Sequence, residues 1–169
     1  MSISPLVLVV GMHRSGTSML GGILQKLGVG LPGELVSADE HNPAGYYEWD
    51  RVVSIQERLL IDLDRWWPSL QGCQPLPEGW LQHPATVRAS LSLRELLSRQ
   101  INHQSSPWCI KDPRTSRLLP LWIGLASELQ LPLRLILAVR DPVEVVHSLV
   151  KRDGPITGMD HNRAQQLWW

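Results

Sequence analysis

A short loop, GMHRSGTS at residues 11–18, has the residue types of a phosphate-binding turn. It follows the apolar run PLVLVV and has the spacing of a G-x-x-x-x-G-K-[ST] loop, whose backbone N–H groups and following helix hold an anion. Thr17 stands where that loop has its lysine, so the point charge used on nucleoside triphosphates is missing. Arg14 supplies a guanidinium that can bind two anion oxygens. The pattern predicts an anion site, with a ligand-free glycine turn as the alternative; its candidate residues are Arg14, Ser15, Gly16, Thr17 and Ser18.

Two further cations stand where apolar runs end. Arg140 follows LRLILAV, Ser148 lies two helical turns further on, and Lys111 ends PWCIK. Ligands of open α/β sheets bind outside the carboxyl ends of the strands, so these side chains are expected to lie near the loop. A structural ion pair is the alternative role for Arg140. Asp112 is expected to cap the helix that follows it.

The hydrophobic pattern predicts one α/β domain, residues 1–169, with a central parallel sheet flanked by helices. Continuous apolar runs are typical of strands buried on both faces, and they stand at 5–10, 107–111 and 133–139. Helices are expected at 17–27, 50–64, 84–102, 114–129 (with Pro120 as a kink or break), 142–152 and from 161 to 169. Gly21 and Gly22 are expected to let the first helix pack closely on the sheet. Loops are expected at 28–47, 65–82 and 152–160.

Composition narrows the function classes. The formal net charge is zero, with 16 basic and 16 acidic residues, which argues against non-specific nucleic-acid binding. The two cysteines form no CxxC pair and the six histidines have no zinc-binding spacing, so no metal is expected. No signal peptide or membrane span is indicated, and the expected location is the cytoplasm, without a membrane partner. The pattern favours no particular oligomeric state.

Taken together, these motifs resemble the family of sulfotransferases that use 3′-phosphoadenosine-5′-phosphosulfate (PAPS). The resemblance is carried by R-S-G-T-S at 14–18, by Arg140 with Ser148, and by the order GMHRSGTS, NPAGYYE (42–48) and KDPR (111–114), which is similar to the bacterial type. It covers essentially the whole chain and implies a three-layer fold like that of P-loop-containing nucleotide hydrolases. Such enzymes usually continue past the point where Trp169 stands, so residues 1–169 would be the N-terminal, donor-binding portion.

The resemblance also implies a reaction. The loop would hold the 5′-phosphosulfate of PAPS, and Arg140 and Ser148 would hold its 3′-phosphate. A sulfuryl group would move in line to a hydroxyl or amine of a small-molecule or glycan acceptor, such as a carbohydrate. Arg14 and Lys111 would stabilise the charge that develops on the departing phosphate. A sulfonate donor needs no Mg²⁺ bridge, so the missing loop lysine is explained.

A general base must take the acceptor proton. Cytosolic relatives use a histidine at the position of Pro113, so Glu48 is the first candidate here, followed by Asp112 and His13. A solvent-facing carboxylate near a helix start is the alternative for Glu48. Residues 31–47 and 65–82 are expected to form the acceptor pocket. Five aromatic residues in or next to these segments could contact the acceptor or simply pack in the core: Tyr46, Tyr47, Trp49, Trp66 and Trp67.

Two other functions fit the same pattern. One is a divergent P-loop kinase or other ATP-binding protein, against which stand the missing lysine and the lack of a strand-end aspartate for Mg²⁺ other than Asp141. The other is an inactive, truncated module that binds a nucleotide without turnover.

Overall fold

The computed structural model describes residues 3–101, 103 and 106–168, and its centre is a sheet of three parallel strands. The strands are β1 (Leu6–Gly11), β2 (Trp108–Lys111) and β3 (Leu133–Ala138), in the order β2-β1-β3. Leu6 pairs with Trp108 on one side and with Leu133 on the other. All three carboxyl ends therefore reach the same edge of the sheet, where the predicted anion site should lie.

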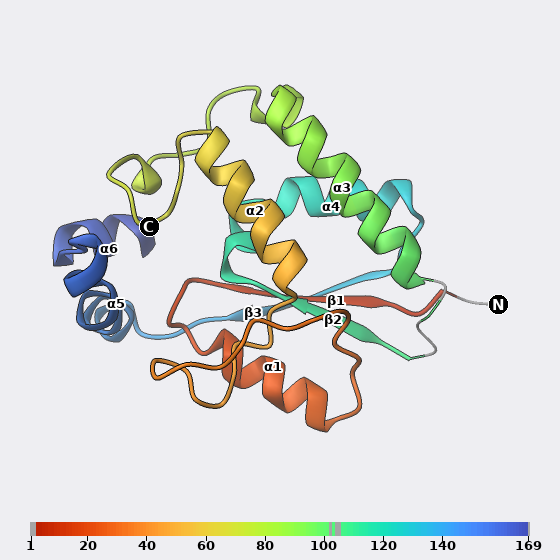
Figure 1. The fold of residues 1–169 in the computed structure, drawn as a ribbon, viewed down its shortest axis with the longest axis horizontal. Helices are drawn as coiled ribbons and strands as arrows, with labels where there is room; N and C mark the ends of the chain where they lie inside the picture. Colours follow the sequence, from red (N-terminus) through yellow and green to blue (C-terminus); the bar gives the residue numbers. More distant parts are fainter. Residues whose placement is uncertain (1–2, 102, 104–105, 169) are drawn as a thin grey trace.

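Helices cover both faces of this sheet (Figure 1). On one face lies α1 (Thr17–Lys26), whose Leu20 and Leu24 pack against Val7 and Val9 of β1. On the other lie α2 (Asp50–Asp62), α3 (Pro84–Ile101) and α4 (Leu119–Glu128), which enclose the main core. Every residue of β1 is buried, as its apolar run predicts. The predicted α/β class, with a parallel sheet flanked by helices, is confirmed.

Two further helices lie at the carboxyl end of the strands, at the left of Figure 1. They are α5 (Pro142–Thr157) and α6 (His161–Trp168), which pack together through Leu149, Met159 and Ala164. The predicted end of α5 near Arg152 is wrong, because the helix continues to Thr157 and ends at the left-handed Gly158 (φ 68°). Packing against α6 outweighs the helix-breaking tendency of Gly154 and Pro155.

The prediction that the third strand is buried is also wrong. β3 is an edge strand, and Leu135 and Leu137 on it are 49% and 67% exposed. In the parallel register, Leu135 and Leu137 lie beside Leu8 and Val10 on the face that α2 to α4 cover, but these helices lie over the other strands. An apolar run predicts a strand but does not say where in the sheet it lies.

The remaining elements agree with the pattern. Pro120 stands in the first turn of α4, and the break predicted there is real, because a separate 3₁₀ turn (Pro113–Ser116) precedes the helix. Residues 65–82 are irregular apart from two 3₁₀ turns, Gln71–Cys73 and Trp80–Gln82. Residues 102 and 169, which end two predicted helices, lie outside the described residues. Within the part of the chain that the structure describes, no helix is both long and apolar enough to cross a membrane.

Candidate anion-binding site

The loop between β1 and α1 has the backbone of a tight, inward-facing turn. Gly11 (φ 149°) approaches β3 so closely that a Cβ there would lie 2.6 Å from the Ala138 carbonyl oxygen. The Gly11 N–H donates to Ser116 Oγ (2.7 Å), which in turn donates to the Gly11 carbonyl (3.0 Å). Arg14 and Gly16 both have positive φ, 67° and 93°. A non-glycine residue in this region costs about 1–3 kcal/mol and is characteristic of functional sites.

A cavity of about 510 Å³ opens beside this loop. Both segments expected to form the acceptor pocket reach it, the first through residues between 36 and 46 and the second through Trp67. The sequence candidates Arg14, Gly16, Thr17, Ser18, Glu48, Lys111 and Arg140 all line it, together with His13, Arg114, Arg152 and Asp153. Ser15 does not line it: its hydroxyl donates to the Met12 carbonyl (2.6 Å), so it holds the turn.

One wall of the cavity joins the two predicted anion sites, although they are far apart in sequence. Arg14 Nε donates to Ser148 Oγ (2.9 Å), and Arg140 Nη1 donates to the Arg14 carbonyl (3.2 Å). Arg140 also forms an ion pair with Glu144 (2.8 Å). Within the described residues, no carboxylate lies within ion-pair distance of Arg14, and burial and the nearby Arg152 charge lower its pKa. Arg14 is thus a partly buried cation whose Nη groups are open to an anion.

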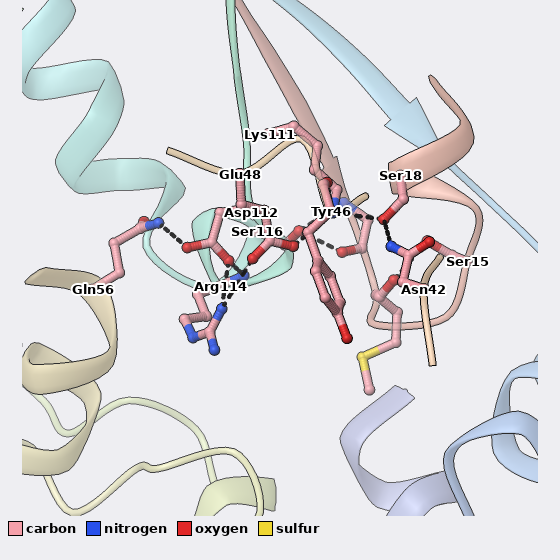
Figure 2. A network of polar contacts seen from close by, with 12 residues as sticks. Ser15, Ser18, Asn42, Tyr46, Glu48, Gln56, Lys111, Asp112, Arg114 and Ser116 are labelled. Carbon is pink, nitrogen blue, oxygen red and sulfur yellow. Dashed lines mark hydrogen bonds and ion pairs between the residues drawn. The ribbon is translucent and has the colours of Figure 1, made fainter. Parts of the chain in front are cut away.

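The floor of the cavity is different, because every charge there is paired (Figure 2). Lys111 Nζ donates to Glu48 Oε1 (2.6 Å), to Ser18 Oγ (2.9 Å) and to the Tyr46 carbonyl (2.9 Å). An ammonium group has three donors, so all of those of Lys111 are used inside the protein. Lys111 therefore contacts the loop through Ser18.

Asp112 and Arg114 extend this buried network. Asp112 accepts from the Arg114 N–H (3.0 Å), so its predicted role as a cap is confirmed, and its other oxygen accepts from Gln56 (2.7 Å). Arg114 forms ion pairs with Asp112 (3.0 Å) and Glu57 (2.9 Å). The Asp112 carboxylate is fully buried, so it does not face the cavity as a base would.

Glu48 lies at the boundary between this network and the cavity. The expectation of a solvent-facing carboxylate is wrong, because the residue is only 7% exposed. Burial raises the pKa of Glu48, and the charge of Lys111 partly opposes this effect. A carboxylate with a raised pKa that lines a cavity is suited to proton transfer.

The segment NPAGYYE, residues 42–48, docks onto the start of α1. Asn42 Nδ2 donates to Ser18 Oγ (3.1 Å). The Tyr47 ring lies against Gly21 and Gly22, where added Cβ atoms would approach Tyr47 atoms to 2.8 and 3.1 Å. The prediction that these glycines pack on the sheet is therefore wrong. Instead, the two glycines leave room for the Tyr47 ring. This contact places Tyr46 and Glu48, the neighbours of Tyr47, at the cavity.

Only two of the five candidate aromatic residues line the cavity, Tyr46 and Trp67. The hydroxyl of Tyr46 donates to Asp39 (2.7 Å), and burial and this contact raise its pKa to about 12. His13 stacks on Trp67 with 4.4 Å between ring centroids. Burial, and then the charges of Arg114, Arg152, Lys111 and Arg14, keep the pKa of His13 well below its usual value. His13 is therefore neutral near pH 7.

The other three aromatic residues have structural roles. Tyr47 lies against Gly21 and Gly22, and Trp49 is buried against Gly33, where a Cβ would clash with its ring. Trp66 donates to Glu57 (2.8 Å).

Several site residues were not predicted from the sequence. Arg152 and Asp153 line the cavity and form an ion pair (2.8 Å), but they stand in the stretch interpreted as the end of a helix and a loop. Ser116 and Asn42 also carry contacts of the loop. Asn42 belongs to the NPAGYYE motif, and its position before a proline and a glycine was the signal that could have found it.

Within the described residues, no group of three or more His, Cys, Asp or Glu side chains is arranged to hold a metal ion.

Comparisons with models of known protein families, with curated protein sequences and with solved structures found no match.

Proposed function

We propose that this chain binds the donor of a PAPS-dependent sulfotransferase reaction, which moves a sulfuryl group to a hydroxyl or amine of an acceptor such as a carbohydrate. One observation carries the proposal. Arg140 and Ser148, which lie 126 and 134 residues after Arg14 in the chain, both contact Arg14. Arg14 and Arg140 line one cavity, and Ser148 lies behind Arg14. A donor with anionic groups at both its 5′ and 3′ positions needs two adjacent anion sites of this kind.

The loop would bind the 5′-phosphosulfate. Backbone N–H groups at the start of α1 and the Nη groups of Arg14 offer donors to its oxygens. Arg140 and Ser148 would bind the 3′-phosphate, for which Arg140 would exchange the exposed Glu144 partner for a doubly charged one. Such exposed i, i+4 pairs contribute little, so the exchange costs little.

In the transfer step, the acceptor oxygen or nitrogen attacks the sulfur and the bond from sulfur to the 5′-phosphate oxygen breaks. The acceptor proton passes to a base, and Glu48 is the carboxylate best placed for it at the cavity floor. The charge that appears on the phosphate oxygen is stabilised by the loop amides and Arg14. Lys111 would act on it through Ser18, because its own three donors are used.

Asp141 supports this donor over Mg-ATP. Two aspartates follow the strands and could take the place of an Mg²⁺ ligand. Asp112, after β2, is buried and bonded to Arg114 and Gln56. Asp141, after β3, caps α5 through its Oδ1, which accepts from the Val143 N–H (2.8 Å). A kinase-like site would need one of these carboxylates for the metal.

The test is calorimetric binding of 3′-phosphoadenosine 5′-phosphate and of Mg-ATP to the same protein. We expect the bisphosphate to bind, and Arg140→Ala to weaken it by about 10-fold through the loss of a charged contact. The matched control is Arg134→Ala, an exposed arginine at the opposite end of β3. Tighter binding of Mg-ATP, or equal effects of the two variants, would contradict the proposal.

A further inference from the structure

The hydroxyl of Ser18 receives two hydrogen bonds from groups that can only donate. Lys111 Nζ lies 2.9 Å and Asn42 Nδ2 lies 3.1 Å from Ser18 Oγ (Figure 2). A protonated amine and an amide nitrogen have no acceptor capacity. A serine hydroxyl has two acceptor positions and one proton. Both acceptor positions of Ser18 are therefore occupied from within the protein.

The proton of Ser18 must then point away from both donors. Ser18 lies in the first turn of α1, where backbone N–H groups already face the cavity, and its side chain lines that cavity. The hydroxyl is thus a donor whose direction is fixed by two contacts, on a residue that lines the cavity. Fixing a donor before the ligand arrives removes the reorganisation cost from the binding or reaction step.

We infer that Asn42 and Lys111 are positioning residues that fix the Ser18 hydroxyl as a hydrogen-bond donor to an oxyanion in the cavity. The identity of that oxyanion, the 5′-phosphosulfate of the donor, rests on the proposed function. The direction of the Ser18 proton rests only on the two contacts. Asn42 is the more informative of the pair, because it is uncharged and its Nδ2 donates to Ser18. Asn42 also lines the cavity, so its effect must be measured with and without the Ser18 hydroxyl.

The decisive variant is Asn42→Asp, which keeps the size of the side chain and replaces the donor by an acceptor. The carboxylate would accept a hydrogen bond from the Ser18 hydroxyl, which would then point away from the anion. It also adds a negative charge, so its effect is measured twice, in the wild type and in the Ser18→Ala background. Charge repulsion between the new carboxylate and the anion acts in both backgrounds. The hydrogen bond to the new carboxylate requires the Ser18 hydroxyl, so it acts only in the wild type.

Calorimetric titration with 3′-phosphoadenosine 5′-phosphate supplies the readout. We expect Asn42→Asp to weaken binding at least about 10-fold more in the wild type than in the Ser18→Ala background, as for the loss of a hydrogen bond to a charged group. Asn42→Ala, which adds no charge, should show the same dependence on Ser18 at about 3-fold, the loss of one neutral contact. Equal penalties in both backgrounds would overturn the inference. Circular dichroism and thermal unfolding identify any variant that is not folded, and Asn42→Ala then carries the test.

A second probe, inorganic pyrophosphate, separates this inference from the proposed function. If pyrophosphate binds with the same dependence on Ser18 while the bisphosphate does not bind, the role of Asn42 stands and the proposed donor falls. If the bisphosphate binds but Asn42 and Ser18 act independently, the proposed function stands and this inference falls. If the folded wild type binds neither, the loop holds no oxyanion and both fall.

Discussion

The floor of the cavity and its wall both carry cations, but these cations differ in whether their donors are used within the protein. On the floor, Lys111 and Glu48 form a pair whose side chains are 1% and 9% exposed, and every ammonium donor has a partner. On the wall formed by the loop and α5, the Arg14 side chain contacts the neutral Ser148 and forms an ion pair with none of the carboxylates that the structure describes. Arg140 forms an ion pair with the exposed Glu144 and donates to the Arg14 carbonyl.

This difference shows that a cation at a strand end does not by itself define a binding site. A buried, fully paired cation has a structural role, because removing one partner of the pair leaves an uncompensated buried charge and destabilises the fold. A partly buried cation with free donors is available to a ligand. Substitutions at Lys111, Arg14, Gly21 and His13 test this division, and the size of the expected effect decreases in that order.

Lys111→Met should give the largest effect, on folding. It removes the closer of the two cations of the buried Glu48 and leaves only Arg114, 3.7 Å away. We expect the free energy of unfolding to fall by about 3–5 kcal/mol in chemical denaturation. Adding Glu48→Gln removes the poorly compensated charge, so the double variant should be more stable than the single one. A double variant that is less stable would show that the pair is not the unit of stability.

Arg14→Ala should affect binding instead. Loss of charged contacts to the anion should weaken binding of 3′-phosphoadenosine 5′-phosphate by about 10- to 100-fold in calorimetry. The free energy of unfolding should change by less than about 1 kcal/mol, since Arg14 makes one neutral side-chain contact. A large loss of stability with unchanged affinity would place Arg14 among the structural cations.

Gly21→Ala should disturb the floor of the cavity, because Gly21 contacts Tyr47, the neighbour of Glu48. The new Cβ would lie 2.8 Å from the Tyr47 Cβ, so the segment that carries Glu48 must move. We expect a loss of about 1–3 kcal/mol in unfolding free energy, as for overpacking. The matched control is Gly124→Ala in α4, where nothing lies within 4 Å and a gain of about 0.5–1 kcal/mol is expected. Equal results would show that Tyr47 moves freely.

The smallest effect concerns pH and His13. Its folded pKa lies below the unfolded value of 6.5, so the unfolded chain binds the proton first as the pH falls. His13 therefore costs stability progressively below about pH 6.5. Thermal unfolding should show the wild type losing stability relative to His13→Gln between about pH 7.5 and 5.5. Glu48, whose raised pKa acts in the opposite direction, is present in both proteins and cancels. A constant difference across this range would contradict the buried, neutral state.

The sequence predicts the site to the level of one sheet edge, because the ends of parallel strands must meet there. Arg14, Lys111 and Arg140 do converge as their strand-end positions predict. The strand-end positions do not predict which of these cations keeps donors open to a ligand. Two of the three partners of Lys111 come from residues 46–48. This segment has no periodicity, and its path depends on the left-handed Tyr47 (φ 58°) and on the contact of its ring with Gly21 and Gly22.

The fold has the same limit. The strands and most helices follow from hydrophobic period, turn residues and proline. The exposure of β3 and the extension of α5 depend instead on where other helices lie, which is decided by packing between distant segments. Local pattern gives the elements, and tertiary contacts decide their neighbours.

The position of β1 in the middle of the sheet has a consequence for biosynthesis. Of the three strands, β1 is synthesised first, and both of its neighbours follow only more than 100 residues later, since Leu6 pairs with Trp108 and Leu133. At translation speeds of about 5–20 residues per second, its apolar residues wait roughly 6–25 s for the second partner. During that interval the nascent chain presents an unpaired hydrophobic strand of the kind that chaperones shield, and high contact order makes the final pairing slow.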